Sequence, residues 1–189
     1  MELRRRPVRR AGRQAGFSLL EVMIAIVVLA VGLVSLLALF ATAVGNMQVA
    51  QEDLIARQKA AQALESVFAA RDTAQLTYTQ IQNVSNGGVF LDGPQQLLQA
   101  GADGIIGTAD DQAPLDQIVL PGPDGLLGTA DDIIIPLAGF TRQIAITPVF
   151  QPNGAIDPSL RQVTVTIRYA TPQGTFRTYQ VASYISSYR

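Results

Sequence analysis

The sequence contains no cysteine and no histidine among its 189 residues. Without cysteine there is neither a disulfide nor a thiolate metal site, and without histidine there is no Ser-His-Asp or Cys-His catalytic arrangement. We find no other convergent set of acid, base and nucleophile, and we assign no catalytic residue. These absences argue against an enzyme and leave structural and binding roles.

Positive charge is scarce outside one short segment. Residues 1–16 hold six arginines and one acidic residue. The rest of the chain has eight basic and 14 acidic side chains, a net charge of −6. Proteins that bind nucleic acid normally present a basic face. The acidic body therefore argues against a nucleic-acid partner.

A long apolar stretch follows the basic segment. Residues 22–51 contain no charged side chain, and residues 22–44 are almost wholly apolar. As a helix rising about 1.5 Å per residue, residues 22–44 span roughly 35 Å, which exceeds the hydrocarbon core of a bilayer. The arginines before this stretch, with no further Lys or Arg until Arg57, predict one pass through the inner membrane with a cytoplasmic N-terminus. A cleaved secretory signal would have a much shorter apolar region.

The front edge of the apolar stretch reads Gly16-Phe17-Ser18-Leu19-Leu20-Glu21-Val22-Met23. It resembles the prepilin peptidase motif of type IV pilins and type II secretion pseudopilins: a basic leader ending in Gly, then Phe, then Glu, then unbroken apolar helix. The resemblance is close over about residues 10–45 and looser along the helix to about residue 70. Within that superfamily, residues 20–33 are most similar to minor pilins of the PilV type.

This resemblance implies a processing site and an assembly site. A prepilin peptidase would cut between Gly16 and Phe17, and the new Phe17 amine would be N-methylated. Glu21 would neutralise the Phe17 amine of a neighbouring subunit during assembly. An acid within a bilayer costs about 2.5–3.5 kcal/mol, which favours this role over an unpartnered carboxylate at the headgroup boundary. The implied partners are the membrane, the prepilin peptidase, and other pilin or pseudopilin subunits.

The residue pattern predicts an α+β fold. No proline occurs between residues 17 and 93, so one helix can run from about Phe17 to about Arg71. Residues 140–150, 161–169 and 175–183 read as antiparallel strands, and their apolar face needs a cover. The second half of the helix is the available cover. We predict that its packing face comprises Met47, Ala50, Leu54, Ala61, Leu64 and Phe68, with Lys59 pointing elsewhere. This architecture, a long helix packed on a small antiparallel sheet, is that of the pilin family.

The chain is expected to have five segments. They are a cleaved leader (1–16), a transmembrane and filament-core helix (17–45), an amphipathic continuation (46–72), an acidic Gly/Asp loop region (73–139) and the antiparallel sheet of the head (140–189).

The loop region contains an internal repeat and no Lys or Arg. Residues 101–111 (the first repeat) and 122–132 (the second repeat) share the pattern Asp-Gly-x-x-Gly-Thr-Ala-Asp-Asp. One interpretation is calcium binding, because the unit supplies several oxygen ligands on a short loop. The other is a pair of Asp-Gly turns whose acids cap short segments. The calcium interpretation, the one cofactor that we consider, assigns as ligands Asp103, Asp110, Asp111, Asp124, Asp131 and Asp132.

These patterns predict a structural subunit, minor rather than major, of a type IV pilus or a type II secretion-like filament. It would start in the bacterial inner membrane and end in a periplasmic or cell-surface filament. Two alternatives stay open: a surface or tip binding module on such a filament, and an unprocessed membrane-anchored periplasmic protein.

Overall fold

The computed structural model describes Gly16, residues 18–172 and residues 174–188. The long helix α1 (Leu19–Asp72) passes through two compact units, Met1–Val44 and Gly45–Arg189. Most of the leader and Phe17 lie outside the described residues.

The part of α1 in the first unit is an exposed apolar helix. Its most apolar window has a mean hydropathy of 3.1 and none of that window is buried, so its length and composition suffice to cross a membrane. The few hydroxyl groups on it are satisfied within the helix. Ser35 donates to the carbonyl of Val31 and Thr42 to that of Ala38, each at 2.9 Å. In a bilayer, such internal bonds remove the cost of an unpaired polar group.

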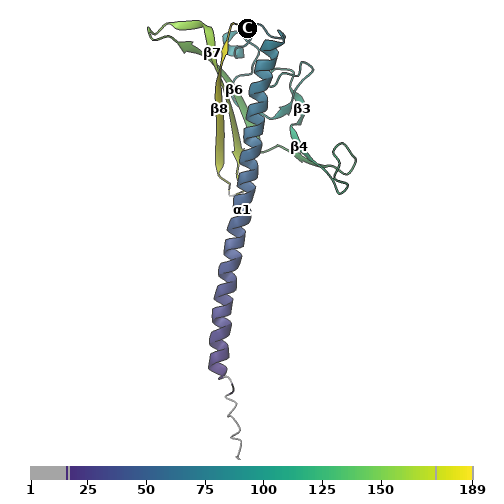
Figure 1. Ribbon diagram of the computed structural model, residues 1–189, viewed down its shortest axis with the longest axis vertical. Coiled ribbons are helices and arrows are strands. Elements are labelled where there is room, and N and C mark those ends of the chain that lie inside the picture. The colour runs from purple at the N-terminus through teal and green to yellow at the C-terminus, as the bar shows by residue number, and fades with distance from the viewer. Residues whose placement is uncertain (1–15, 17, 173, 189) are drawn as a thin grey trace, which may run out of the picture. The chain divides into compact units, whose positions relative to one another are not determined.

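The second unit is built on a four-stranded antiparallel sheet with the order β1-β6-β7-β8 (Figure 1). Its strands are β1 (Gln95–Gln96), β6 (Phe140–Phe150), β7 (Ile156–Ala170) and β8 (Phe176–Ser186). Alternate residues of β6 and β7 face inward, as the alternation of apolar residues predicts. The inward side chains include Ile144, Ile146, Val163, Val165 and Ile167, all buried. The predicted α+β fold, a long helix packed on an antiparallel sheet, is therefore confirmed.

The helix face that packs on the sheet differs from the predicted one. The buried α1 residues are Ala56, Lys59, Ala60, Ala63, Val67 and Ala70. Met47 and Leu54 are exposed, and Leu64 and Phe68 are half-buried. The prediction was therefore right for Leu64 and Phe68, which pack against the core, and wrong for the exposed residues Met47, Ala50, Leu54 and Ala61. Alanines lie on the buried face instead, and their small side chains let a sheet approach the helix backbone closely.

Lys59 lies on this buried face because it has a partner. Its Nζ lies 2.7 Å from Asp116 Oδ1, and both side chains are largely buried. The same Asp116 oxygen accepts the backbone N–H of Gln117 at 2.8 Å. A buried charge is tolerated when it is paired and hydrogen-bonded, as it is here.

The segment predicted as loops contains short elements. They are the 3-10 helix η1 (Val84–Asn86) and the strands β2 (Leu98–Gln99), β3 (Gln112–Leu115), β4 (Gln117–Leu120) and β5 (Ile133–Pro136). Strand β2 pairs with β3 and β4 with β5, both antiparallel. In Figure 1, β3 and β4 lie on the opposite side of α1 from β7 and β8. The first repeat precedes β3, and the second repeat closes the β4–β5 hairpin.

Asn83 joins this segment to the sheet. Its Nδ2 donates to the carbonyl of Ile144 at 2.7 Å, and its Oδ1 accepts the N–H of Ile146 at 2.7 Å. The side chain is buried and takes the place of a neighbouring strand along this part of β6. This role is not apparent from the sequence, because an isolated Asn followed by Val-Ser-Asn-Gly is typical of a surface turn.

Candidate functional sites

The proposed processing and assembly site lies at the start of α1. Gly16 is exposed, and a Cβ placed there would meet no other atom within 4 Å. The carbonyl of Ser18 accepts the N–H groups of Glu21 at 3.0 Å and Val22 at 3.2 Å, which closes the first helical turn. Glu21 in this turn is exposed, and a carboxylate there is favoured by the unpaired N–H groups of a helix N-terminus. Phe17, the other predicted site residue, lies outside the described residues.

The two repeats fold into the same hydrogen-bonded turn. In the first repeat, Asp103 accepts the N–H of Ile105 at 2.7 Å, and Asp111 accepts that of Gly107 at 2.8 Å. In the second, Asp124 accepts the N–H of Leu126 at 2.8 Å, and Asp132 accepts that of Gly128 at 2.7 Å. The glycines at 104, 107, 125 and 128 all have positive φ, from 70° to 90°, which explains why both copies keep them.

The middle acid of each repeat is held by a threonine. Thr108 Oγ1 donates to Asp110 Oδ1 at 2.6 Å, and Thr129 Oγ1 donates to Asp131 Oδ1 at 2.6 Å. These bonds, with backbone N–H groups from Asp103 and Asp124, hold the pKa of Asp110 and Asp131 below the usual range. Both oxygens of each carboxylate are thus already used by the turn.

This arrangement favours the turn interpretation of the repeats over the metal interpretation. Among the described residues, no group of three or more acidic side chains is arranged to hold a metal ion. The six aspartates predicted as ligands instead accept hydrogen bonds within their own repeat. Calcium binding stays a prediction, and nothing below depends on it.

The surroundings of the two repeats differ. In the first, Ile105 and Ile106 are 2% and 6% exposed, and the Ile106 N–H donates to Ser66 Oγ on α1 at 2.9 Å. Arg142, buried on β6, lies 3.3 Å from Asp111. Burial raises the pKa of Asp111, while the Gly107 N–H and Arg142 act to lower it.

In the second repeat, the equivalent apolar pair is not buried: Leu126 and Leu127 are 62% and 65% exposed. Arg142 was not singled out from the sequence, because an arginine in a strand is normally exposed.

Comparison with known proteins gives a match in the N-terminal part of the chain. Residues 12–37 match the family described as the prokaryotic N-terminal methylation motif. A search of curated proteins found no match, and neither did a search of solved structures.

The chain therefore carries the prepilin-type cleavage and methylation motif found in type IV pilins and pseudopilins, and its fold, a long helix packed on an antiparallel sheet, is pilin-like. Pilins, which carry this motif, are structural rather than enzymatic proteins. The motif implies processing by a prepilin peptidase and assembly with other pilins, and the apolar helix implies anchoring in the inner membrane before assembly.

Proposed function

We propose that the chain is a structural subunit of a type IV pilus or a type II secretion-like filament, minor rather than major. A prepilin peptidase cuts it between Gly16 and Phe17 on the cytoplasmic side, and the Phe17 amine is methylated. The observation that carries this proposal is the match of residues 12–37 at the start of an apolar helix that has no packing partner among the described residues of its own unit. The similarity of residues 20–33 to PilV-type minor pilins supports the minor role.

The chemistry of the site fits each step. Gly16 has no side chain to obstruct approach of a protease, and it is exposed. Cleavage removes six arginines, whose charges would hold the helix in the membrane. The Phe17 amine and Glu21 are four residues apart, one helical turn. Glu21 of one subunit can then pair with the Phe17 amine of the next, which sets the register of apolar helices in the filament core.

The test is the intact mass of the protein from membranes of a host that has a prepilin peptidase. We expect the wild-type chain to lack residues 1–16 and to carry one added methyl group. Gly16→Ala should stay full-length, because a side chain then obstructs the cleavage site. Gly32→Ala is the matched control, since a Cβ at Gly32 also meets nothing within 4 Å, and it should be cleaved normally. A full-length wild-type chain would reject the proposal in favour of an unprocessed membrane-anchored protein.

A further inference from the structure

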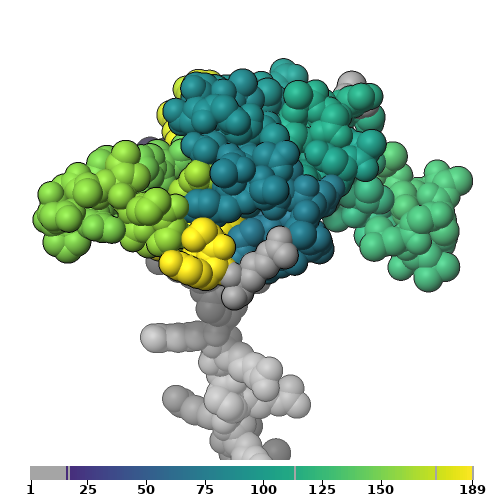
Figure 2. Space-filling model, turned by 90° about the horizontal axis from the view of Figure 1, so that it is seen from above, coloured from purple at the N-terminus to yellow at the C-terminus, as the bar shows by residue number. Residues whose placement is uncertain are grey.

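The second repeat presents to solvent the surface that the first repeat buries. The two have the same turn and equivalent apolar pairs, Ile105-Ile106 and Leu126-Leu127. In one copy this pair is buried in the core, and in the other it is exposed at the end of the β4–β5 hairpin. Figure 2 shows this hairpin end projecting from the second unit. The first repeat therefore shows what kind of surface this turn fits.

The surface that receives the first repeat combines an arginine with apolar and aromatic groups. Arg142 lies 3.3 Å from Asp111 and supplies the positive charge. A Cβ added to Gly107 would touch Ile144 and lie 3.7 Å from Phe90, so the turn backbone packs directly on these side chains. The repeat thus binds through its last aspartate and its apolar pair together.

The second repeat lacks the corresponding arginine. Asp132 is the counterpart of Asp111, yet none of the four ion pairs formed by the described residues includes it. Its Oδ1, like Asp111 Oδ1 in the first repeat, is buried and has no hydrogen-bond partner among the described residues, so the difference in polar partners between the two aspartates is the arginine alone. With Asp124 and Asp131, Asp132 makes the second repeat a projecting surface with three negative charges and no basic residue.

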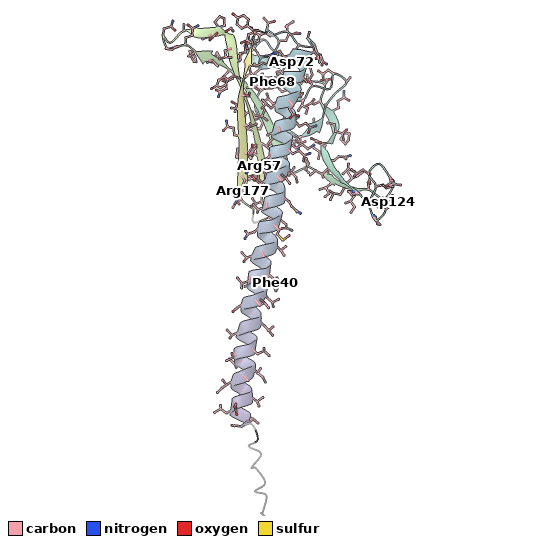
Figure 3. All side chains as sticks on the ribbon, in the orientation of Figure 1. Phe40, Arg57, Phe68, Asp72, Asp124 and Arg177 are labelled. Atoms are coloured by element: carbon pink, nitrogen blue, oxygen red, sulfur yellow. The ribbon has the colours of Figure 1, made fainter. Side chains whose placement is uncertain are left out.

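A surface with the complementary chemistry lies elsewhere in the same unit. It comprises Arg168, Phe176 and Arg177 at the β7–β8 turn, here called the basic patch. All three are exposed, Phe176 by 61%, and the Arg168 guanidinium lies 3.9 Å from the centre of the Phe176 ring. Arg177 forms no ion pair with any described residue. In Figure 3, Arg177 and Asp124 lie on opposite sides of α1.

We propose that the second repeat of one copy docks on the basic patch of a second copy. Leu126 and Leu127 pack against Phe176, while Arg168 and Arg177 supply the charge that Arg142 gives to Asp111 in the first repeat. This inference rests on the proposed function, and the contact forms at those places in the filament where two copies of this chain are adjacent. The two surfaces are different patches of one chain, so the contact is head-to-tail. Such a contact leaves one free surface at each end of a pair, so it can join further copies into a ring or an open array.

The experiment is disulfide cross-linking between two singly substituted full-length chains in the same cells. The natural chain has no cysteine, so every cross-link reports on the introduced positions. One chain carries Leu127→Cys and the other Phe176→Cys, and sheared filaments are analysed without reductant. A disulfide needs Cα atoms within about 7 Å. We expect a mixed dimer that is lost when Arg177→Glu is added and kept with Arg177→Lys.

The matched control replaces Phe176→Cys by Ile156→Cys. Ile156 is a similarly exposed apolar residue at the β6–β7 turn, away from the basic patch, and should give no mixed dimer. The docking inference is overturned if the processed chain enters filaments but positions 127 and 176 do not cross-link, or if position 127 cross-links only to a different protein. The proposed function stands in both cases. If the chain is never processed and no filament contains it, both proposals fail.

Discussion

At the scale of single residues, the head depends on polar side chains placed where backbone groups would otherwise lack partners. Asn83 is the clearest case, because it serves the carbonyl of Ile144 and the N–H of Ile146 along an uncovered part of β6. Its Nδ2 also donates to the carbonyl of Leu91 at 3.3 Å. One buried amide thus fixes the segment after α1 to the sheet.

We expect Asn83→Ala to lower the free energy of unfolding of the head by about 3 kcal/mol, because buried backbone groups lose their partners. Thermal and denaturant unfolding of the full-length chain in detergent measures this. Asn86→Ala, at an exposed position three residues later, is the control and should change the value by no more than about 0.5 kcal/mol. Equal effects of the two substitutions would show that Asn83 does not fix the segment.

At the scale of elements, the sequence predicted the helix and the long strands, whose residue patterns are regular. The alternation of Val163, Val165 and Ile167 identified β7, and the absence of proline identified α1. The strands β1 to β5 were missed because they are two to four residues long and carry no alternation that can be counted. The buried face of α1 was only partly predicted. Most of its residues are alanines, and Lys59 was read as exposed because its partner Asp116 is distant in sequence.

The candidate sites also differ in whether they depend on local sequence or on residues that are distant in sequence. The Gly16, Phe17 and Glu21 motif could be read directly, because its information is local. The repeats were recognised too, but the sequence did not show that one copy is buried and the other exposed. That difference depends on Ser66 and Arg142, which lie far from the first repeat in sequence.

The two repeats allow a paired test of this difference. A Cβ at Gly101 would clash with Asp110, and one at Gly122 would clash with Asp131 in the same manner. We expect Gly101→Ala to lower the free energy of unfolding by about 1–3 kcal/mol, because the strain reaches the core through Ile105 and Ile106. Gly122→Ala should cost less, since the exposed hairpin can shift. Melting temperatures of the two variants compare them, and an equal loss would contradict the assignment of the first repeat to the core.

At the scale of the whole molecule, the chain combines two units with different demands. The described part of the first unit has an apolar surface and one acid, Glu21, near its start, whereas the second unit has a packed core of its own. Stability of the head and assembly of the filament should therefore respond to different substitutions.

We expect Glu21→Gln to leave cleavage and the stability of the head unchanged. The amount of the chain in sheared filaments should fall by about tenfold or more, which corresponds to a loss of at least about 1.4 kcal/mol of attraction between subunits. The reason is that a neutral amide cannot balance the charge of the Phe17 amine. Immunoblots of filament and membrane fractions measure this distribution. Glu65→Gln, which removes an exposed acid from α1 in the second unit, is the control and should assemble normally. Normal assembly of Glu21→Gln would remove this residue from the mechanism.

The buried ion pair between Lys59 and Asp116 has a practical consequence for chemical labelling. Lys59 is the one lysine in the sequence, and its amino group is shielded and held at 2.7 Å from a carboxylate. Reagents that acylate primary amines will therefore react mainly with the N-terminal amine of the folded chain. Under the proposed function, cleavage moves that amine to Phe17 and methylation turns it into a secondary amine, so a fall in labelling would report on the methylation step.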